Sequence, residues 1–324
     1  IAVVEHNTVE TICTHSQRTC MVTTLQEIAL KVRVALGMSF SDGGNKFCAI
    51  YHEHAHADQR VFVSSRVNKQ LGYCAVLIDG ENQRPMIVNV GNFTAPTGDT
   101  PSLLTIDETR TLFHELGHAL HGFLTQTKYP SVSGTSVARD FVELPSQIME
   151  HWAIEPEVMK MYALHYETGE PITDELIAKM QATSSFNSGF ETVELVGAAL
   201  LDMEYHMLTD YTDFEANVFE KSVADKIGLI PQIAFRYRGP YFNHVFSGGY
   251  AVGYYSYLWA EVLDADAFAV FRAHGGISRE IGNRFRDCIL RKGGSEHPAH
   301  LYVAFKGSEP TIDALLKRDG IQGR

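Results

Sequence analysis

The sequence predicts a mainly helical protein with one small β-sheet near its beginning. Beyond about residue 103, apolar residues recur at the spacing of amphipathic helices. Before that point, short segments rich in Val and Ile lie between turn residues, as strands do. Hydrophobic residues make up 45% and charged residues 20% of the 324-residue chain, a balance that excludes a disordered tail, a collagen-like chain or a coiled-coil rod.

The first part of the chain predicts one helix and then the strands. Apolar residues at helical spacing place the helix at Thr23–Leu36, and Gly37 is a suitable stop. The expected strands are Arg60–Val67, Tyr73–Asp79 and Pro85–Val90.

The remainder predicts a series of helices. Ile106–Leu124 is the first, with Asp107 as its expected N-cap. Asp140–Trp152 is the second, and Pro145 must lie in its first turn. The further expected helices are Glu157–Glu167, Asp174–Ala182, Thr192–Thr209, Phe214–Ile227, a Tyr-rich helix within Gly248–Asp264, Ser278–Arg291 and Thr311–Arg318.

Charge and cysteine content narrow the partners and the compartment. The net charge of −12 disfavours binding to nucleic acid, because an acidic chain repels phosphates. No run of about 18 apolar residues is present, so we expect no membrane span. The five Cys form no CxxC pair, which favours a reducing, cytoplasmic compartment. The chain begins without Met or a signal-peptide pattern, so we expect it to be a piece of a longer protein.

The strongest functional signal is the HExxH motif from His114 to His118. On a helix, these two His lie one turn apart on one face, so both imidazoles can reach one ion. Glu115 lies beside them and can hold a water there. The ligand types predict one Zn²⁺ per chain, held in a catalytic site by three protein ligands. The alternative is a helix whose two His only pack or face solvent.

A third ligand must come from elsewhere in the chain. The position six residues after His118, which metzincins use, is Leu124, so that class is excluded. His121 follows His118 by one turn, and its expected role is a hydrogen bond to a ligand rather than ligation. Carboxylates of the next helix are the other candidates, and spacing alone does not choose between Glu143 and Glu150, which share a face. The full set of candidates is Asp140, Glu143, Glu150 and Glu155.

A tyrosine-rich segment is the second informative stretch. Tyr250, Tyr254 and Tyr257 are spaced to line one helical face. Their hydroxyls, with the imidazole of His244, are suitable donors to an oxyanion formed during peptide hydrolysis. An aromatic core stripe is an equally good interpretation of this spacing.

Three weaker signals have ordinary explanations. The alternating His of His52–Asp58 are candidate metal ligands, but such clusters are more often exposed loops. Arg236 and Arg238 are candidate partners for a substrate carboxylate, although solvated surface Arg is the commoner case. Asp140 is a candidate acceptor for a ligand His or a member of a structural ion pair.

Long segments of the chain resemble the thimet-oligopeptidase family of zinc metallopeptidases, and within it the peptidyl-dipeptidases (dipeptidyl carboxypeptidases). The first is FHELGHALHGFLTQTKYPSVSGTSVARDFVELPSQIMEHWA, Phe113–Ala153, and another is Arg236–Asp264. The resemblance implies a zincin-type catalytic helical domain over residues 71–324, preceded by a poorly matched segment, 1–70. It also implies that the third zinc ligand is the Glu of the FVE-PSQ segment, which is Glu143.

The resemblance further implies roles for individual residues. Glu115 becomes the general base, with Tyr257 and His244 as donors to the oxyanion. The implied substrate-binding residues are Tyr250, Tyr254, Gly134 and Thr135.

The implied activity is the release of dipeptides from the C-termini of short peptides. An endo-acting oligopeptidase of the same family is one alternative, and a zinc-binding but catalytically silent fragment that binds peptides or a partner is another. Members of the family carry an additional N-terminal helical half that walls the cleft. We therefore expect an exposed apolar face where that half would pack.

Overall fold

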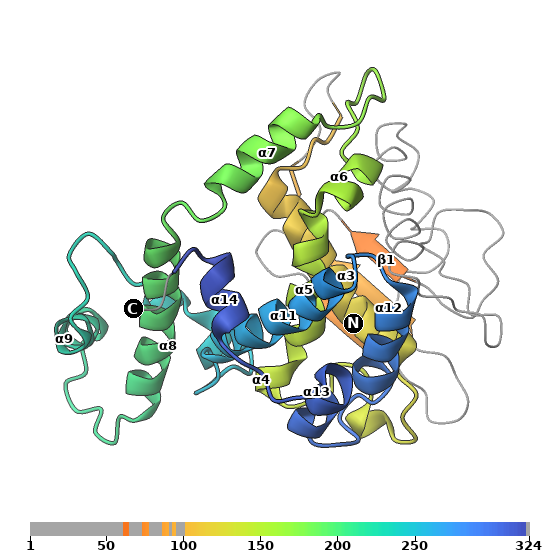
Figure 1. Cartoon of the computed structure of the whole chain (residues 1–324). Helices are drawn as coiled ribbons and strands as arrows, with labels where there is room; N and C mark the ends of the chain where they lie inside the picture. Colours follow the sequence, from red (N-terminus) through yellow and green to blue (C-terminus); the bar gives the residue numbers. More distant parts are fainter. Residues whose placement is uncertain (1–60, 65–72, 78–85, 91–92, 95–100, 322–324) are drawn as a thin grey trace, which may run out of the picture.

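The computed structural model describes residues 61–64, 73–77, 86–90, 93–94 and 101–321 (Figure 1). It confirms the mainly helical class. The expected helix at Thr23–Leu36, the His52–Asp58 cluster and most of the segment 1–70 lie outside the described residues. None of the described helices is both long enough and apolar enough to cross a membrane.

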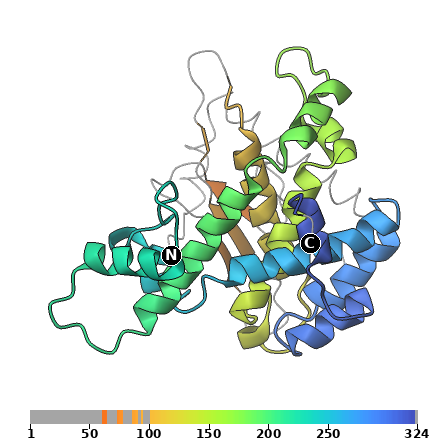
Figure 2. The same cartoon turned by 60° about the vertical axis from the view of Figure 1, so that its left-hand side comes forward.

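A three-stranded sheet lies beside the first described helix, α3 (Ile106–Leu124), as Figure 2 shows. Its strands are β1 (Val61–Ser64), β2 (Tyr73–Leu77) and β3 (Met86–Val90), each inside a segment predicted as a strand. β3 is central and pairs parallel with β1 and antiparallel with β2. The helix α3 packs on β2 and β3, where the side chain of Ile87 is fully buried in the main core. The sheet thus supports α3 from one side.

Helix α3 (Ile106–Leu124) has the predicted bounds but a different N-cap. Thr105 caps it, not Asp107: the Glu108 N–H donates to the Thr105 hydroxyl at 3.1 Å, and the Thr105 N–H donates to the Glu108 carboxylate at 2.9 Å. This reciprocal pair is a capping box, and Thr-x-x-Glu is its sequence signature. The prediction of Asp107 was wrong because it overlooked this pair.

The predicted helix Asp140–Trp152 is two helices, α4 (Arg139–Val142) and α5 (Leu144–Ala153), which meet at Glu143. Pro145 explains the break. It has no N–H to donate to the carbonyl four residues earlier, and its ring crowds that carbonyl. Pro145 lies in the first turn of α5, as predicted. Glu143 is therefore placed at a corner, from which its side chain turns toward α3.

The remaining helices complete the main body and a side lobe, which is formed by α8 and α9 (Figure 1). They are α6 (Pro156–Tyr162), α7 (Asp174–Thr183), α8 (Ser188–His206), α9 (Ala216–Ile227), α10 (Asn243–Phe246), α11 (Ser256–Ala273), α12 (Arg279–Phe285), α13 (Pro298–Lys306) and α14 (Asp313–Arg318), with a π-helical turn at Arg286–Leu290 and short 3₁₀ turns at Pro130–Val132 and Gly239–Tyr241. The sequence prediction missed α13, a short helix between Pro298 and Gly307.

Three apolar clusters hold these helices together. The largest joins α3, α5, α11, α12 and α13 in the centre of the molecule (Figure 1). A second joins α8 to the chain before and within α11, and a third joins α8 to α9 on the left of that view. One face of α8 and the residue that follows this helix also carry exposed apolar side chains: Phe190, Val193, Leu200 and Met203 on the helix, and Met207 after it. This is an exposed apolar face of the expected kind, and what covers it stays a prediction.

Candidate metal centre and tyrosine turn

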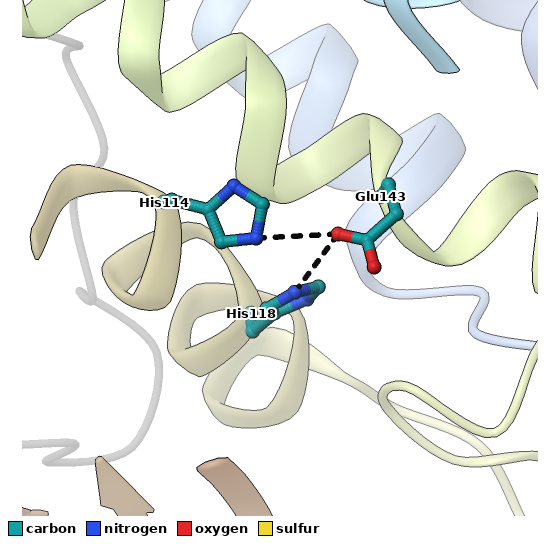
Figure 3. Close-up of side chains that lie close together, drawn as sticks. All are labelled: His114, His118 and Glu143. Carbon is teal, nitrogen blue, oxygen red and sulfur yellow. Dashed lines mark ion pairs between the residues drawn. The ribbon is translucent and has the colours of Figure 1, made fainter. Parts of the chain in front are cut away.

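His114, His118 and Glu143 come together between α3 and the α4–α5 corner (Figure 3). The Nε2 atoms of both His lie 3.2 Å from the same oxygen, Oε2 of Glu143. One ligand atom from each residue lies within 4.8 Å of the others. The Glu143 side chain is almost fully buried, so its charge requires partners.

Close backbone packing accounts for this convergence. At Gly117, between the two His, α3 touches the start of α5, and a Cβ would lie 2.5 Å from Cα of Ser146 and overlap the Pro145 carbonyl oxygen. Because Glu143 precedes Pro145 by two residues, this contact brings its carboxylate to the His face of α3. Ser146 then donates its hydroxyl to Glu143 Oε2 at 2.8 Å, which orients the carboxylate.

The structure distinguishes the four candidate carboxylates. Glu150 lies on the opposite side of His114 from Glu143, with its Oε1 2.7 Å from His114 Nδ1. Asp140 accepts a hydrogen bond from the Tyr255 hydroxyl, and Glu155 forms an ion pair with Arg272. Sequence reasoning had Glu150 only as a rival ligand. The seven-residue spacing of Glu143 and Glu150 places both on one face, and this was the available signal that both would face α3.

The groups of the cluster shift one another's pKa values, and His114 is at their centre. Burial disfavours its charged form, but hydrogen bonds to Glu143 and Glu150 outweigh burial and raise the pKa of His114 to about 10. Burial also opposes ionisation of Glu143, but the His118 and His114 imidazoles hold the pKa of that carboxyl well below its usual range. The site therefore keeps a carboxylate between two imidazoles and favours a cation among them.

This donor set fits a zinc ion. Two imidazole nitrogens and one carboxylate oxygen are zinc ligands in hydrolytic sites, and an acceptor on the second nitrogen of a ligand His is the usual support. Glu150 provides that acceptor for His114. Within the described part of the chain the cluster has three members, which leaves a coordination position for water or substrate.

Glu115 lies next to the cluster on α3 and is buried. Burial raises its pKa above the ordinary value, and the neighbouring His114 and His118 oppose that rise. A carboxyl group with a raised pKa exchanges protons more readily near neutral pH than an ordinary one. Glu115 is thus suited to proton transfer beside the cluster.

His121 behaves differently from the prediction. It is fully buried, and neither ring nitrogen has a hydrogen-bond partner within the described ranges, so the expected bond to a ligand is not observed there. Burial, with a smaller effect of His118, lowers the pKa of His121 to about 3, so its ring is neutral.

The tyrosine segment is a turn and not a helical face. α10 ends at Phe246 and α11 begins at Ser256, so Tyr250 and Tyr254 both precede the helix that contains Tyr257. The prediction of one helical face was wrong because Gly248, Gly249 and Gly253 interrupt the pattern with turns.

The turn nevertheless brings two of the tyrosines to the cluster. The Tyr250 hydroxyl donates to Glu143 Oε1 at 2.5 Å. The rings of Tyr250 and Tyr257 are stacked, with centroids 5.3 Å apart, and the Arg139 guanidinium lies 4.5 Å from the centroid of the Tyr250 ring. Both hydroxyls stay protonated: burial, followed by the negative charge of Glu143, raises the pKa of Tyr250 and of Tyr257.

His244 lies among the same aromatic rings. Its ring centroid is 6.3 Å from that of Tyr257. Burial and then the positive charge of Arg236 lower its pKa, so the imidazole is neutral at pH 7. Its Nδ1 is buried and has no hydrogen-bond partner among the residues that the structure describes. A neutral imidazole in this place has one N–H to donate.

The other predicted residues lie in varied surroundings. Tyr254 is 3% exposed and packs in the second apolar cluster, which favours a packing role. Gly134 is buried, and its N–H donates to the Thr125 hydroxyl; the substrate-binding roles of Gly134 and its neighbour Thr135 stay predictions.

Arg236 and Arg238, the candidate partners for a substrate carboxylate, have different surroundings. Arg238 forms an ion pair with buried Glu220 and also donates to Asn217, so its guanidinium binds two side chains of α9. Arg236 is exposed and lies over the ring of Tyr237.

Comparisons with a family model and with curated proteins agree on one family of peptidases. The model of peptidase family M3 matches residues 44–321. The dipeptidyl carboxypeptidase of Salmonella typhimurium is 46% identical over 246 residues, covering 74% of this chain and 35% of that protein. Oligopeptidase A of Escherichia coli is 43% identical over 248 residues, covering 76% of this chain and 36% of that protein. The chain thus spans about a third of the length of the curated relatives it matches.

A solved structure shares the fold. The crystal structure of BsuCP matches with a TM-score of 0.50 and 13% identity, over 92% of this chain and 57% of that one.

Proposed function

This chain belongs to peptidase family M3, and from that membership we propose that it is the catalytic part of a zinc metallopeptidase that hydrolyses short peptides. The observation that carries the proposal is the convergence of His114, His118 and Glu143 on one point. We assign these three residues to one Zn²⁺ and residues 71–324 to the catalytic domain. At such a site zinc supplies Lewis acidity.

Glu115 is the proposed base. Its carboxylate accepts a proton from the attacking water at Oε1 or Oε2 and returns it to the nitrogen of the leaving amine. Its burial and its place beside His114 and His118 support this assignment. The raised pKa allows the carboxyl to hold the proton between the two transfers.

Tyr257 and His244 are the proposed donors to the oxyanion. Both groups are neutral and partly enclosed by other aromatic rings, so their donor hydrogens act in a site with little competing water. Tyr250 is held by Glu143 and stacks on Tyr257, so its proposed role is to contact substrate and to fix the Tyr257 ring.

Release of C-terminal dipeptides is the favoured activity. It rests on the likeness to dipeptidyl carboxypeptidases, which is slightly higher than that to oligopeptidases A. Internal cleavage by an oligopeptidase remains the second candidate because the two identities, 46% and 43%, are so close. We propose a cytoplasmic site of action, in keeping with the acidic chain and its Cys content.

The short span of the chain supports a third candidate, a fragment that binds zinc but is catalytically silent without the rest of the protein. The matched segment covers only 35% and 36% of the lengths of these relatives, and the remainder of their chains is the proposed source of the missing cleft wall. Zinc binding without turnover is the property that separates this candidate from the other two.

The decisive experiment is mass spectrometry of the products formed from a pentapeptide with a blocked N-terminus. The zinc-loaded wild-type chain is compared with Glu115→Gln at equal zinc content. Loss of a C-terminal dipeptide by the wild type alone supports the favoured activity, and internal cuts support the oligopeptidase. Equal rates for the two proteins would reject Glu115 as the base, and no cleavage with zinc bound supports the silent part.

A further inference from the structure

Asp202 on α8 is a buried carboxylate outside the metal cluster, with a side chain aimed at the tyrosine turn. The residue is only 1% exposed. Its Oδ1 accepts the backbone N–H of Val252 at 3.0 Å, and its Oδ2 accepts the backbone N–H of Tyr254 at 3.0 Å. His206, one turn later on α8, places its Nδ1 2.8 Å from Oδ1. The carboxylate thus binds two alternate amides of the turn.

The turn between those amides has an unfavourable backbone. Val252 has φ +58°, in the left-handed region that a β-branched residue rarely adopts. Its side chain is 45% exposed, so little burial compensates for this conformation. The two hydrogen bonds to a charged acceptor are the observed contacts that stabilise it.

The held turn leads directly to the candidate site. Tyr250, two residues before Val252, donates to Glu143 and stacks on Tyr257. The Gly253 N–H donates to the Tyr250 carbonyl at 2.8 Å, so the conformation at residues 252–254 is coupled to that of Tyr250. A change in the turn therefore moves the Tyr250 ring relative to Glu143 and Tyr257.

We propose that Asp202 is a positioning residue that holds the 250–254 turn in its strained form and thereby sets the Tyr250 and Tyr257 hydroxyls against Glu143. Its catalytic consequence rests on the proposed peptidase function, whereas the positioning itself does not. Among the described residues, the polar partners of the Asp202 carboxylate are Val252, Tyr254 and His206, which lie outside the cluster, so Asp202 acts through the backbone amides of the turn.

Asp202→Asn is the sharpest variant, because the amide keeps the shape and one acceptor but places an NH₂ group where the second acceptor was. Glu220→Gln is the matched control. Glu220 is a buried carboxylate of the same lobe that accepts from Tyr205 and from the Gly239 N–H. It has no part in the tyrosine turn, so it reports general loosening of the lobe.

The first readout is hydrogen exchange at the Val252 and Tyr254 amides in the chain without peptide. We expect exchange to become about tenfold faster or more in Asp202→Asn, because a hydrogen bond to a charged group is lost, and to change less than twofold in Glu220→Gln. Unchanged exchange in Asp202→Asn, or equal acceleration in both variants, would overturn the proposal. This readout decides the positioning even if the wild type cleaves no peptide.

The second readout is pentapeptide cleavage at equal zinc content. We expect Asp202→Asn to lower kcat about tenfold or more with KM and zinc stoichiometry near the wild type, and Glu220→Gln to change kcat less than twofold. Faster exchange with unchanged kcat would reject the catalytic consequence.

A rescue variant keeps the test valid if Asp202→Asn folds poorly. Glycine adopts the left-handed conformation without strain, so Val252→Gly should restore folding and at least half of the lost kcat in the Asp202→Asn background. A double variant no better than Asp202→Asn would contradict the idea that the carboxylate stabilises the conformation of Val252.

Discussion

Gly117 of α3 and Pro145 of α5 are in backbone contact, and their contact leaves no room for a Cβ on Gly117. His114 and His118 lie on either side of Gly117, and Glu143 lies two residues before Pro145. Gly117, the glycine of the HELGH segment, therefore brings the two parts of the cluster together, although it supplies no ligand.

We expect Gly117→Ala to lower the free energy of unfolding by about 3 kcal/mol or more, because α3 and α5 must separate to admit the methyl group. Zinc affinity should fall with it. Urea denaturation and zinc titration measure the two effects. Gly189→Ala is the control: its added Cβ meets no atom within 4 Å, and we expect it to be neutral or to stabilise by up to about 1 kcal/mol. Equal stability of the two variants would contradict the close contact.

Glu143 and Glu150 should affect zinc binding to different degrees. We expect Glu143→Gln to weaken zinc affinity more than a hundredfold because it removes a direct ligand charge. Glu150→Gln should weaken it about 10- to 100-fold, as expected for the acceptor that orients His114. Competition with a chelator measures both affinities. The reverse order would make Glu150 the ligand.

The hydroxyl of Tyr257 should matter for turnover but not for zinc. We expect Tyr257→Phe to lower kcat about 100-fold, the usual effect of removing one oxyanion donor, while zinc content stays at one per chain. Tyr255→Phe is the matched control, since Tyr255 is exposed and its hydroxyl donates to Asp140 at 3.0 Å. Steady-state kinetics test the pair, and similar losses in both variants would argue against a specific donor role.

The capping box of α3 predicts a pH dependence of stability. Burial is the largest single effect and opposes ionisation of Glu108, but the hydrogen bonds from Thr105 and Thr94 together outweigh it and lower its pKa below the ordinary value. Because the folded pKa is the lower one, ionised Glu108 stabilises the fold at neutral pH. That contribution is lost as the pH falls below the ordinary pKa of Glu and through the folded one.

We therefore expect Glu108→Gln to cost about 0.5–1 kcal/mol at pH 7 and progressively less below about pH 4. Urea denaturation at both pH values gives the difference from wild type. Thr105→Ser keeps the hydroxyl acceptor and should stay within about 0.5 kcal/mol at either pH. A cost for Glu108→Gln that does not shrink in acid would reject the charged cap.

Local sequence patterns predicted the helices well and the site only in part. The bounds of α3 follow from the apolar spacing around His114 and His118, and Pro145 lies in the first turn of α5, as predicted. The break at Glu143 was missed because the apolar pattern continues across it. The choice between Glu143 and Glu150 depends on how α5 docks on α3, which helical spacing does not encode.

The tyrosine turn shows the same limit of local patterns. Tyr250 and Tyr257 do stack beside Glu143, but through a turn rather than a helical face. The backbone of that turn is set by Asp202, which lies 50 residues before Val252 in the chain. A tertiary contact at that separation leaves no periodic signal, so no local pattern singles out Asp202.

The hydrogen bond between Tyr250 and Glu143 spans 107 residues, whereas His118 and Glu143 lie much closer in the chain. Closing a short loop costs less chain entropy than closing a long one, and during synthesis α3 and α5 emerge well before α11. We therefore expect a nascent chain to bring His114, His118 and Glu143 together before the turn that contains Tyr250 has been synthesised. An ion captured at that stage would fasten α5 to α3 early, so the zinc supply during synthesis would govern how much folded protein forms.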